Sequence, residues 1–437
     1  MRVAVVGAGP AGLYTAQSLV DAGALVDVID RLAAPYGLVR YGVAPDHMRM
    51  KSVVKVLRKP FTASDAGFIG NVTVGQDLSL ADLREHYHAV VYATGCPLDR
   101  SLGIPGEDLT GSIGSGRFVG WYCGHPDVAG FTPPLEDPGA VVIGAGNVAL
   151  DVTRVLAVSP DRLRATDVPD PVLAALAASR VRDIHVVIRR GPWHARFTPA
   201  ELRGLGELDN TRVLVHDDGT LTRADPAGLD LRQRQNLQIL REWSAREHGS
   251  GDRRIHLWFL RTPVALRGDD RVHRVVVERT RVEHDRVVAT GEQDTLAAGL
   301  VVRAIGYRSG PVDGLPFDTV TGTVPNERGR VAPGLYVAGW LKRGPSGVIG
   351  TNKADGAETA AAVLEDLPHL SDPAHSATEH LRRVLDQRGV RHTDWPGWLR
   401  IDAEERHLGS SRGAERIKVC RRGAMVRLAR AAHFAST

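Results

Sequence analysis

Residues 2–30 read RVAVVGAGPAGLYTAQSLVDAGALVDVID. The apolar run Arg2–Val6 passes directly into the glycine turn Gly7-Ala8-Gly9-Pro10-Ala11-Gly12, and an amphipathic stretch follows through Leu19. A second apolar run then ends at Asp30. This order of strand, glycine turn, helix and strand is typical of the βαβ unit that begins a parallel sheet. We therefore predict a parallel sheet whose first turn carries a nucleotide-binding loop.

The residue types in this turn suit a dinucleotide. Its glycines permit a tight turn, close packing of helix on strand, and close approach of backbone N–H groups to a pyrophosphate at the helix N-terminus. A carboxylate at Asp30 accepts hydrogen bonds from the hydroxyls of an unphosphorylated ribose, as in FAD or NAD. Taken alone, the glycine turn could simply pack a helix against a strand, and Asp30 could be a solvated strand end. Because the turn and Asp30 occur together at the ends of two consecutive strands, they predict a dinucleotide site. Its residues are Gly7, Gly9, Pro10, Ala11, Gly12 and Asp30.

A second glycine turn, Gly144-Ala145-Gly146-Asn147-Val148-Ala149, also follows an apolar run and precedes a helical stretch. The next apolar run, Ile184–Ile188, leads into Arg189-Arg190 and not into an acid. Two guanidinium groups at a strand end suit the 2′-phosphate of NADPH, which a carboxylate would repel. In isolation an arginine pair is a solvated surface feature, but its position after this motif favours NADPH. One FAD site and one NADPH site together imply hydride transfer to a flavin.

The wider pattern predicts an α/β fold with parallel sheets, because short apolar runs alternate with longer amphipathic stretches. The clearest strand candidates are Arg2–Val6, Leu25–Ile29, His88–Tyr92, Ala140–Ile143, Ile184–Ile188, Leu300–Ile305 and Leu335–Val337. A chain of 437 residues exceeds what one core normally organises. Clusters of Gly and Pro at 103–106 and 310–316 mark crossings between domains. We predict two Rossmann-like domains: an FAD-binding domain of residues 1–105 and 330–437, and an NADP-binding domain of residues 106–329 inserted within it.

Composition excludes several other classes of protein. The 55 basic and 51 acidic side chains give a net charge of +4 spread along the chain, which argues against a nucleic-acid partner. Cys96, Cys123 and Cys420 form no C-x-x-C pair, so neither a redox dithiol nor a metal site is indicated. The first strand begins at residue 2, which leaves no room for a signal segment, and no apolar run is long enough for a bilayer. We expect a cytoplasmic protein without a membrane partner.

A third glycine-rich stretch occupies residues 336–350, YVAGWLKRGPSGVIG. It predicts a strand, a loop and a helix from about Lys353, whose N-terminus would stabilise negative charge on a reduced flavin. The chain resembles the adrenodoxin reductase family in this stretch and in four others. They are GLVRYGVAPDH at 37–47, FVGWY at 118–122, GNVALDV at 146–152 and RRGP at 189–192. The members of this family are ferredoxin-NADP reductases with a glutathione reductase-type fold. The resemblance extends over nearly the whole chain.

The resemblance implies specific cofactor contacts and a partner. The residues it assigns to FAD include Ala11, Asp30, Leu38, Val74, Trp340, Gly347, Val348 and Ile349. Those it assigns to NADPH, beside the turn that begins at Gly144, are Gly146, Asn147, Val148, Ala149, Arg189, Arg190, Glu201 and Gly347. The family passes two electrons from NADPH to FAD and then one at a time to a small acidic iron-sulfur protein, often serving haem monooxygenases. Its contact with that protein is expected to be transient and electrostatic.

Three further positions bear on catalysis and docking. His47 matches a histidine near the flavin ring, where an imidazole that titrates near neutrality would exchange the flavin proton; the alternative is a histidine that satisfies a loop backbone. Arg203 matches an arginine implicated in docking the acidic partner, and a solvated arginine is the alternative. Gly204 stands where the family usually has a glutamate that shares proton transfer with the histidine, so the acid-base pair is incomplete here.

Three alternative functions make different demands on the sequence: two enzymes that need clustered or paired cysteines, and a binding protein that needs no catalytic activity. A subunit like the small subunit of glutamate synthase would carry cysteine-rich cluster-binding segments, and a thioredoxin reductase-like enzyme would need a redox cysteine pair. This chain has neither. A flavin- and nucleotide-binding protein with an interaction or sensing role is the alternative from a different class. Two departures from the family's residues leave it open: Gly204, and Cys123 in place of a common Asn.

Overall fold

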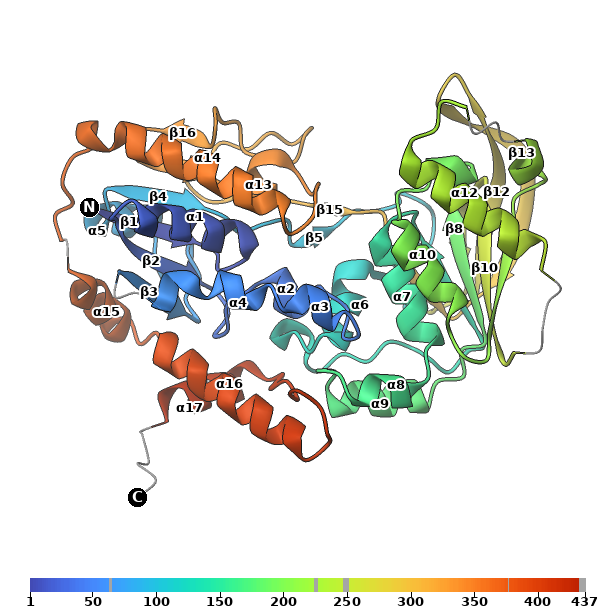
Figure 1. Ribbon diagram of the computed structural model, residues 1–437, viewed down its shortest axis with the longest axis horizontal. Coiled ribbons are helices and arrows are strands. Elements are labelled where there is room, and N and C mark those ends of the chain that lie inside the picture. The colour runs from blue at the N-terminus through green and yellow to red at the C-terminus, as the bar shows by residue number, and fades with distance from the viewer. Residues whose placement is uncertain (63–64, 224–226, 247–250, 376, 432–437) are drawn as a thin grey trace. The chain divides into compact units, whose positions relative to one another are not determined.

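The computed structural model describes residues 1–62, 65–223, 227–246, 251–375 and 377–431. The chain folds into two compact units, each built on its own six-stranded sheet (Figure 1). The first unit consists of Met1–Leu98, Cys123–Ala129 and Tyr307–Thr437, and the second unit of Asp99–Tyr122 and Gly130–Gly306. The second unit is thus inserted into the first in the order of the chain.

The sheet of the first unit has the strand order β16-β17-β4-β1-β2-β3. The strands are β1 (Arg2–Val6), β2 (Leu25–Asp30), β3 (Ala66–Gly70), β4 (Ala89–Tyr92), β16 (Arg330–Ala332) and β17 (Leu335–Val337). All neighbours pair in parallel except β16. Every residue of β1 and β4 is buried, which explains their continuous apolar sequences.

Two long helices, α1 (Pro10–Asp21) and α14 (Thr351–Asp366), lie side by side in the first unit (Figure 1). A Cβ added at Gly356 of α14 would lie 2.8 Å from the backbone nitrogen of Thr15 on α1. Glycine at this position is therefore required for the two helices to approach so closely. The shorter elements of this unit are α2 (Leu38–Tyr41), α3 (Met48–Lys51), α4 (Val54–Leu57), η1 (Lys59–Thr62), α5 (Leu80–His86), η2 (Pro126–Val128), α13 (Trp340–Arg343) and η4 (Leu367–His369).

The C-terminal helices belong to the core of the first unit. They are α15 (Thr378–Gln387), α16 (Trp395–Ser410) and α17 (Arg422–Arg430). Glu405 of α16 is fully buried, where Oε2 accepts a hydrogen bond from Nη1 of Arg40 at 2.9 Å. Lys418 Nζ donates to the carbonyl oxygens of Arg40 and Cys123 at 2.8 and 3.0 Å. These buried hydrogen bonds fix the C-terminal segment to the N-terminal one.

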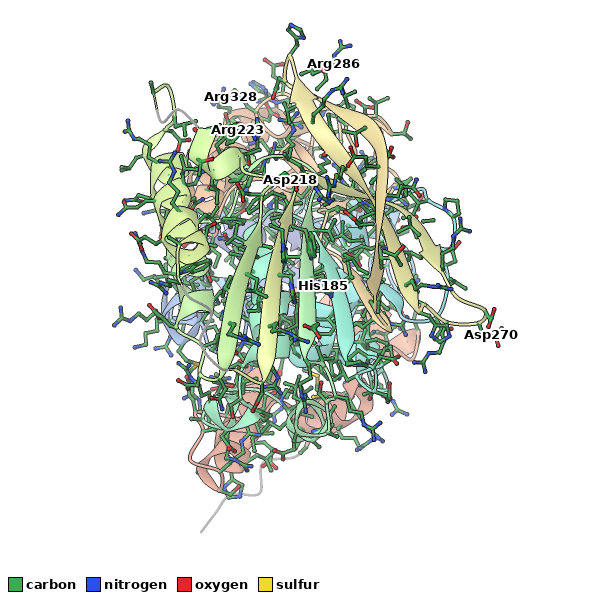
Figure 2. All side chains as sticks on the ribbon, turned by 90° about the vertical axis from the view of Figure 1, so that its right-hand side faces the viewer. His185, Asp218, Arg223, Asp270, Arg286 and Arg328 are labelled. Carbon is green, nitrogen blue, oxygen red and sulfur yellow. The ribbon has the colours of Figure 1, made fainter. Side chains whose placement is uncertain are left out.

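The sheet of the second unit has the order β6-β14-β7-β8-β10-β9, and all its neighbours pair in parallel. Its strands are β6 (Ser112–Gly114), β7 (Gly139–Ile143), β8 (Asp183–Ile188), β9 (Thr211–His216), β10 (Arg253–Phe259) and β14 (Leu300–Arg303). The helices of this unit are α6 (Ser115–Tyr122), α7 (Asn147–Ala157), α8 (Pro160–Arg164), α9 (Asp170–Ala177), η3 (Pro192–His194), α10 (Pro199–Gly206), α11 (Thr220–Arg223) and α12 (Leu231–Ser244). His185 of β8 lies on this sheet in Figure 2.

A three-stranded antiparallel sheet packs against the second unit's parallel sheet. It consists of β11 (Arg261–Arg267), β12 (Arg274–Glu283) and β13 (Arg286–Ala297). Its apolar side chains join Val141 and Val187 of the parallel sheet in one buried cluster. Asp270 and Arg286 mark the hairpin turns at its two ends (Figure 2).

The seven predicted strands are all present, with ends within two residues of those expected.

The domain boundaries differ from those predicted at residues 105 and 330. The turn at 103–106 lies inside the second unit, because Leu266 N–H donates to Pro105 O at 2.8 Å. Residues 307–329 belong to the first unit, where Val324 is fully buried and Leu315 and Phe317 pack on the same apolar cluster. The chain passes between the units at β5 (Leu98–Asp99), on either side of Cys123–Ala129, and directly before β15 (Tyr307–Arg308). The Gly and Pro residues indicate turns at these positions, but the packing of the neighbouring side chains determines to which unit each turn belongs.

No helix among the described residues is long and apolar enough to cross a membrane.

We expect the buried ion pair in the first unit to be essential for its stability. Arg40→Met leaves the fully buried carboxylate of Glu405 without its main partner, which costs about 3 kcal/mol in the free energy of unfolding. Urea unfolding followed by circular dichroism measures this change. Arg406→Ala is the matched control, because Arg406 pairs with Asp402 on the same helix but is 53% exposed and should contribute less than about 1 kcal/mol. Equal losses in the two variants would contradict the assignment.

Candidate functional site

The first glycine turn is tight on one side and open on the other. A Cβ added at Gly7 would lie 2.5 Å from Ala93 O, and one at Gly12 would lie 2.0 Å from Gly7 O. A Cβ at Gly9 would meet nothing within 4 Å. Gly9 is the N-cap of α1 and provides no side-chain cap, and no acid lies in the first turn. The N-terminal N–H groups of α1 therefore remain available to an anion such as a pyrophosphate.

Asp30 lies beside this turn at the end of β2. Its Oδ2 accepts a hydrogen bond from Ala8 N–H at 2.6 Å, and its Oδ1 accepts one from Leu32 N–H at 2.8 Å. Burial raises the pKa of Asp30, and the two backbone N–H groups oppose that rise. Each carboxylate oxygen has a second lone pair, so the group can still accept hydrogen bonds from ribose hydroxyls. Val74 lies near the same strand end, since Val72 N–H donates to Asp30 O at 3.0 Å.

The segment that carries Leu38 packs directly on the first glycine turn. Tyr36 N–H donates to Ala8 O at 2.8 Å. Gly37 has a φ of +46°, and a Cβ there would lie 2.9 Å from the Cα of Gly9. This close approach brings the start of α2 to the turn, and Leu38 remains 47% exposed there.

The C-terminal glycine stretch reaches the same helix end. A Cβ added at Gly339 would lie 2.6 Å from the Cβ of Ala11, and Gly339 N–H donates to Asp355 Oδ2 at 2.5 Å. Trp340 follows as the first residue of α13 and stacks on Tyr307, with ring centroids 6.0 Å apart. The predicted residues Gly347, Val348 and Ile349 lie just before Gly350, the N-cap of α14, and Val348 is 71% exposed.

These residues fit FAD. An uncapped helix N-terminus faces open space at Gly9, and a carboxylate stands beside it. Leu38 and Val348 expose large apolar side chains on segments next to this helix end, and a flat aromatic ring would cover such surfaces. The individual FAD contacts remain predictions.

The second glycine turn has the same construction in the second unit. A Cβ at Gly144 would lie 2.3 Å from Ala304 O, whereas one at Gly146 would meet nothing within 4 Å. Gly146 is the N-cap of α7 and provides no side-chain cap; Asn147, Val148 and the buried Ala149 form the first turn of that helix. Two hydrogen bonds hold the loop before α10 against this turn: Thr198 N–H to Asn147 Oδ1 and Arg196 N–H to Ala145 O, both at 2.8 Å. The arrangement fits a second dinucleotide.

The two predicted phosphate-binding arginines differ in their surroundings. Arg189 is exposed. Arg190 donates from Nη1 to Asp285 Oδ1 at 2.9 Å and from Nη2 to Asp285 O at 2.7 Å. Asp285 and His284 form the turn between β12 and β13, with φ of 62° and 48°. Three of the five guanidinium N–H groups of Arg190 remain for a phosphate. No sequence motif marks Asp285 as part of this site, because it lies 95 residues from its partner.

Helix α10 carries Glu201, Arg203 and Gly204. The hydroxyl of Thr198 caps this helix by accepting from Glu201 N–H at 3.4 Å, so the helix begins at the loop that contacts the second glycine turn. Glu201 Oε2 lies 4.0 Å from Nη2 of the buried Arg154. Arg203 is exposed, and a Cβ at Gly204 would meet nothing within 4 Å. Packing therefore does not demand glycine at this position, and a larger side chain would fit.

The roles predicted for two further residues are not tested by the contacts that the structure describes. His47 is half-buried, precedes α3, and donates its backbone N–H to Ala44 O at 3.1 Å. Its proposed proton exchange remains a prediction. Gly347 was assigned to NADPH as well as to FAD, but it belongs to the first unit whereas the other NADPH residues belong to the second. Its contact with NADPH also remains a prediction.

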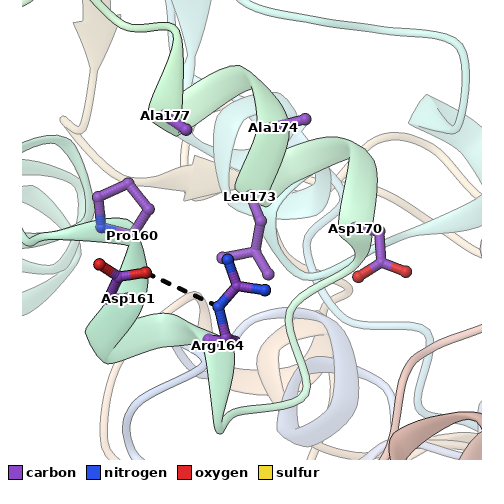
Figure 3. A pocket seen from close by; sticks show the side chains of 7 residues that line it. All are labelled: Pro160, Asp161, Arg164, Asp170, Leu173, Ala174 and Ala177. Atoms are coloured by element: carbon purple, nitrogen blue, oxygen red, sulfur yellow. Dashed lines mark ion pairs between the residues drawn. The ribbon is translucent and has the colours of Figure 1, made fainter. Parts of the chain in front are cut away.

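A hollow between α8 and α9 lies outside these sites (Figure 3). It is lined by Pro160, Asp161, Arg164, Asp170, Leu173, Ala174 and Ala177. Its one ion pair among the residues drawn joins Arg164 Nε to Asp161 Oδ1 at 3.7 Å, and both side chains are largely exposed. None of the predicted cofactor residues lines it.

The chain is similar to known proteins over almost its full length. Residues 1–159 match the family model of pyridine nucleotide-disulphide oxidoreductases. The chain is 41% identical to the NADPH-ferredoxin reductase FprA of Mycobacterium tuberculosis, with 98% of each chain covered. It is 39% identical to the mitochondrial NADPH:adrenodoxin oxidoreductase of Bos taurus, covering 98% of this chain and 92% of the other. The solved structure of Mycobacterium tuberculosis FprA in complex with NADPH superposes with a TM-score of 0.94 at 40% identity, covering 98% of this chain and 99% of that one.

Identity at this level over the whole length, together with two glycine-lined nucleotide turns in the expected places, shows that the chain belongs to the family of NADPH-ferredoxin and NADPH:adrenodoxin reductases.

Proposed function

We propose that this protein is an FAD-dependent NADPH-ferredoxin reductase, which oxidises NADPH and passes the electrons one at a time to a ferredoxin-type iron-sulfur protein. The main support is that α1 and α7 both begin at glycine turns without a side-chain cap. The N-terminus of α1 lies beside the carboxylate of Asp30. In the second unit, the strand that follows α7 in the sequence, β8, is followed by Arg189 and Arg190. The full-length similarity to reductases that act on ferredoxin or adrenodoxin supports the same chemistry.

The charges at the two sites select different nucleotides. Bound FAD would supply hydride acceptance and single-electron release. The N-terminus of α1 would bind its pyrophosphate, and Asp30 would accept hydrogen bonds from its ribose hydroxyls. The N-terminus of α7 would bind the pyrophosphate of NADPH, and Arg189 and Arg190 would bind its 2′-phosphate. His47 would hold or release a proton at the flavin side of the first unit.

The partner and its setting follow from the same proposal. An acidic iron-sulfur protein would associate transiently, because electron carriers must leave after each transfer, and the exposed Arg203 would contribute to its docking. We expect the enzyme to act in the cytoplasm and to supply electrons to haem monooxygenases.

Rapid mixing of the FAD-loaded protein with NADPH under anaerobic conditions tests the activity. NADPH should bleach the flavin absorbance quickly and NADH slowly, and one member of a panel of bacterial ferredoxins should then reoxidise it. A flavin that NADPH cannot reduce would instead favour a nucleotide-binding protein with a sensing role, consistent with Gly204 in place of the family's glutamate.

The arginine pair should determine the preference for NADPH over NADH. Arg189→Ala combined with Arg190→Ala removes the charge-assisted hydrogen bonds to the 2′-phosphate, each worth about 1.5–3 kcal/mol. The Michaelis constant for NADPH should therefore rise by about a hundredfold or more, with little change for NADH. Steady-state kinetics with both nucleotides measures this. Arg279→Ala, in the neighbouring three-stranded sheet, is the control; equal effects on both nucleotides in the double variant would contradict the assignment.

His47 should influence the pH dependence of flavin reduction. His47→Ala removes the side chain proposed to exchange the flavin proton, so the pH profile of the stopped-flow reduction rate should shift or flatten. His407→Ala, an exposed histidine on α16, is the control and should leave the profile unchanged. If the profile of His47→Ala equals that of the wild type, His47 has only a structural role.

A further inference from the structure

The first unit carries a strongly basic surface segment that the cofactor sites do not use. Three of the six lysines in the chain lie at positions 51, 55 and 59, with Arg49 and Arg58 among them. No Asp or Glu occurs between Asp46 and Asp65. We call residues 48–59 the basic segment. A run of like charge is often just a solvated face, so its structure decides whether it presents an organised surface.

The basic segment is firmly attached on one side only. It forms α3, α4 and the start of η1, and Leu57 joins the core of the first unit at 1% exposure. Directly after it, Phe61 stacks on Trp395 with ring centroids 4.4 Å apart. The exposed basic side chains are Arg49, Lys55, Arg58 and Lys59. The apolar attachment therefore holds the backbone in place while the charges extend into solvent.

The positive charge of this surface is not neutralised locally. Within the part of the chain that the structure describes, none of these four exposed side chains forms an ion pair. Met50 and Val56 lie among them and are 43% and 44% exposed. A cluster of unpaired cations raises the local potential and attracts an oppositely charged partner, and exposed apolar side chains among them provide short-range contact. This combination suits a protein with an acidic face more than a small anion, which would need a cradle of converging donors.

We infer that the basic segment, with Met50 and Val56, is a docking surface for the acidic iron-sulfur protein; this rests on the function proposed above. The segment follows directly on residues 37–47, which carry Leu38 and His47, both assigned to the flavin side. Lys51 lies one helical turn beyond His47, about 6 Å along the axis of α3. A partner seated on this surface would therefore lie next to the loop assigned to the flavin. Arg203 belongs to the second unit and is not one of the residues of this surface.

Charge reversal tests this surface in the full-length, FAD-loaded protein. The docking variant is Lys55→Glu/Arg58→Glu/Lys59→Glu. The control variant, Arg84→Glu/Arg383→Glu/Arg427→Glu, makes the same change in net charge at exposed positions elsewhere in the first unit. At low ionic strength the second-order rate of ferredoxin reduction should fall by about tenfold or more in the docking variant, with a weaker dependence on salt. Flavin reduction by NADPH and electron transfer to ferricyanide should be unchanged in both variants.

A carbodiimide cross-link provides a second, independent readout, because it joins a lysine amine to a carboxylate of the bound ferredoxin. Lys342 and Lys418 are buried, with exposures of 8% and 4%, whereas Lys55, Lys59 and Lys353 are exposed. Mass spectrometry of the wild-type complex should find cross-links at Lys55 and Lys59. Cross-links confined to Lys353 would overturn the inference.

The outcomes separate failure of the docking surface from failure of the proposed function. A wild-type protein that reduces none of the ferredoxins contradicts both. If the wild type reduces a ferredoxin and the docking variant behaves like the control variant, only the docking surface is wrong.

Binding to phosphatidylglycerol vesicles tests whether the basic segment faces a membrane instead. If the docking variant loses vesicle binding but keeps its rate with ferredoxin, the basic segment faces a membrane and the inference is overturned.

Discussion

The close contact between the first glycine turn and its surroundings is the constraint on which the first unit depends. A Cβ at Gly12 would lie 2.0 Å from Gly7 O, and one at Gly7 would lie 2.5 Å from Ala93 O. Only glycine at these two positions allows α1 to pack directly against the strand ends while its N-terminus stays open. Gly144 meets the same requirement in the second unit, where a Cβ would lie 2.3 Å from Ala304 O. The residues that make tight packing possible therefore also create the anion sites.

This coupling explains why so much of the fold and of the glycine turns can be predicted from sequence. Buried parallel strands such as β1 and β7 are continuous apolar runs, and their glycine turns follow within a few residues, so the signal is local. The strands that sequence analysis missed are less apolar. All six residues of β9 are half-buried, and β10 alternates buried residues with Arg254, His256 and Trp258. Their identity as strands depends on neighbours already in the sheet.

Long-range contacts were beyond sequence reasoning for a different reason. Arg40 and Glu405 are 365 residues apart, and neither residue type predicts burial until the other is present. The domain boundaries show the same limit, because residues 307–329 belong to the first unit through the packing of Val324 and its neighbours. Asp285 reaches Arg190 from a hairpin turn whose sequence shows no relation to a nucleotide site. Local motifs specify the turns, whereas tertiary packing specifies the partners of their charges.

The contact with Asp285 makes the two arginines of the second site unequal. Two hydrogen bonds to Asp285 already order Arg190, which saves about 0.5–1.5 kcal/mol of the entropy that a free side chain would lose on binding phosphate. The Asp285 carboxylate opposes this gain: at about 6 Å in water it repels a doubly charged phosphate by about 1.4 kcal/mol before screening. The two effects nearly cancel. The two arginines therefore differ in how they are ordered, since Arg190 is held by Asp285 and Arg189 is exposed, more than in their net attraction for the 2′-phosphate.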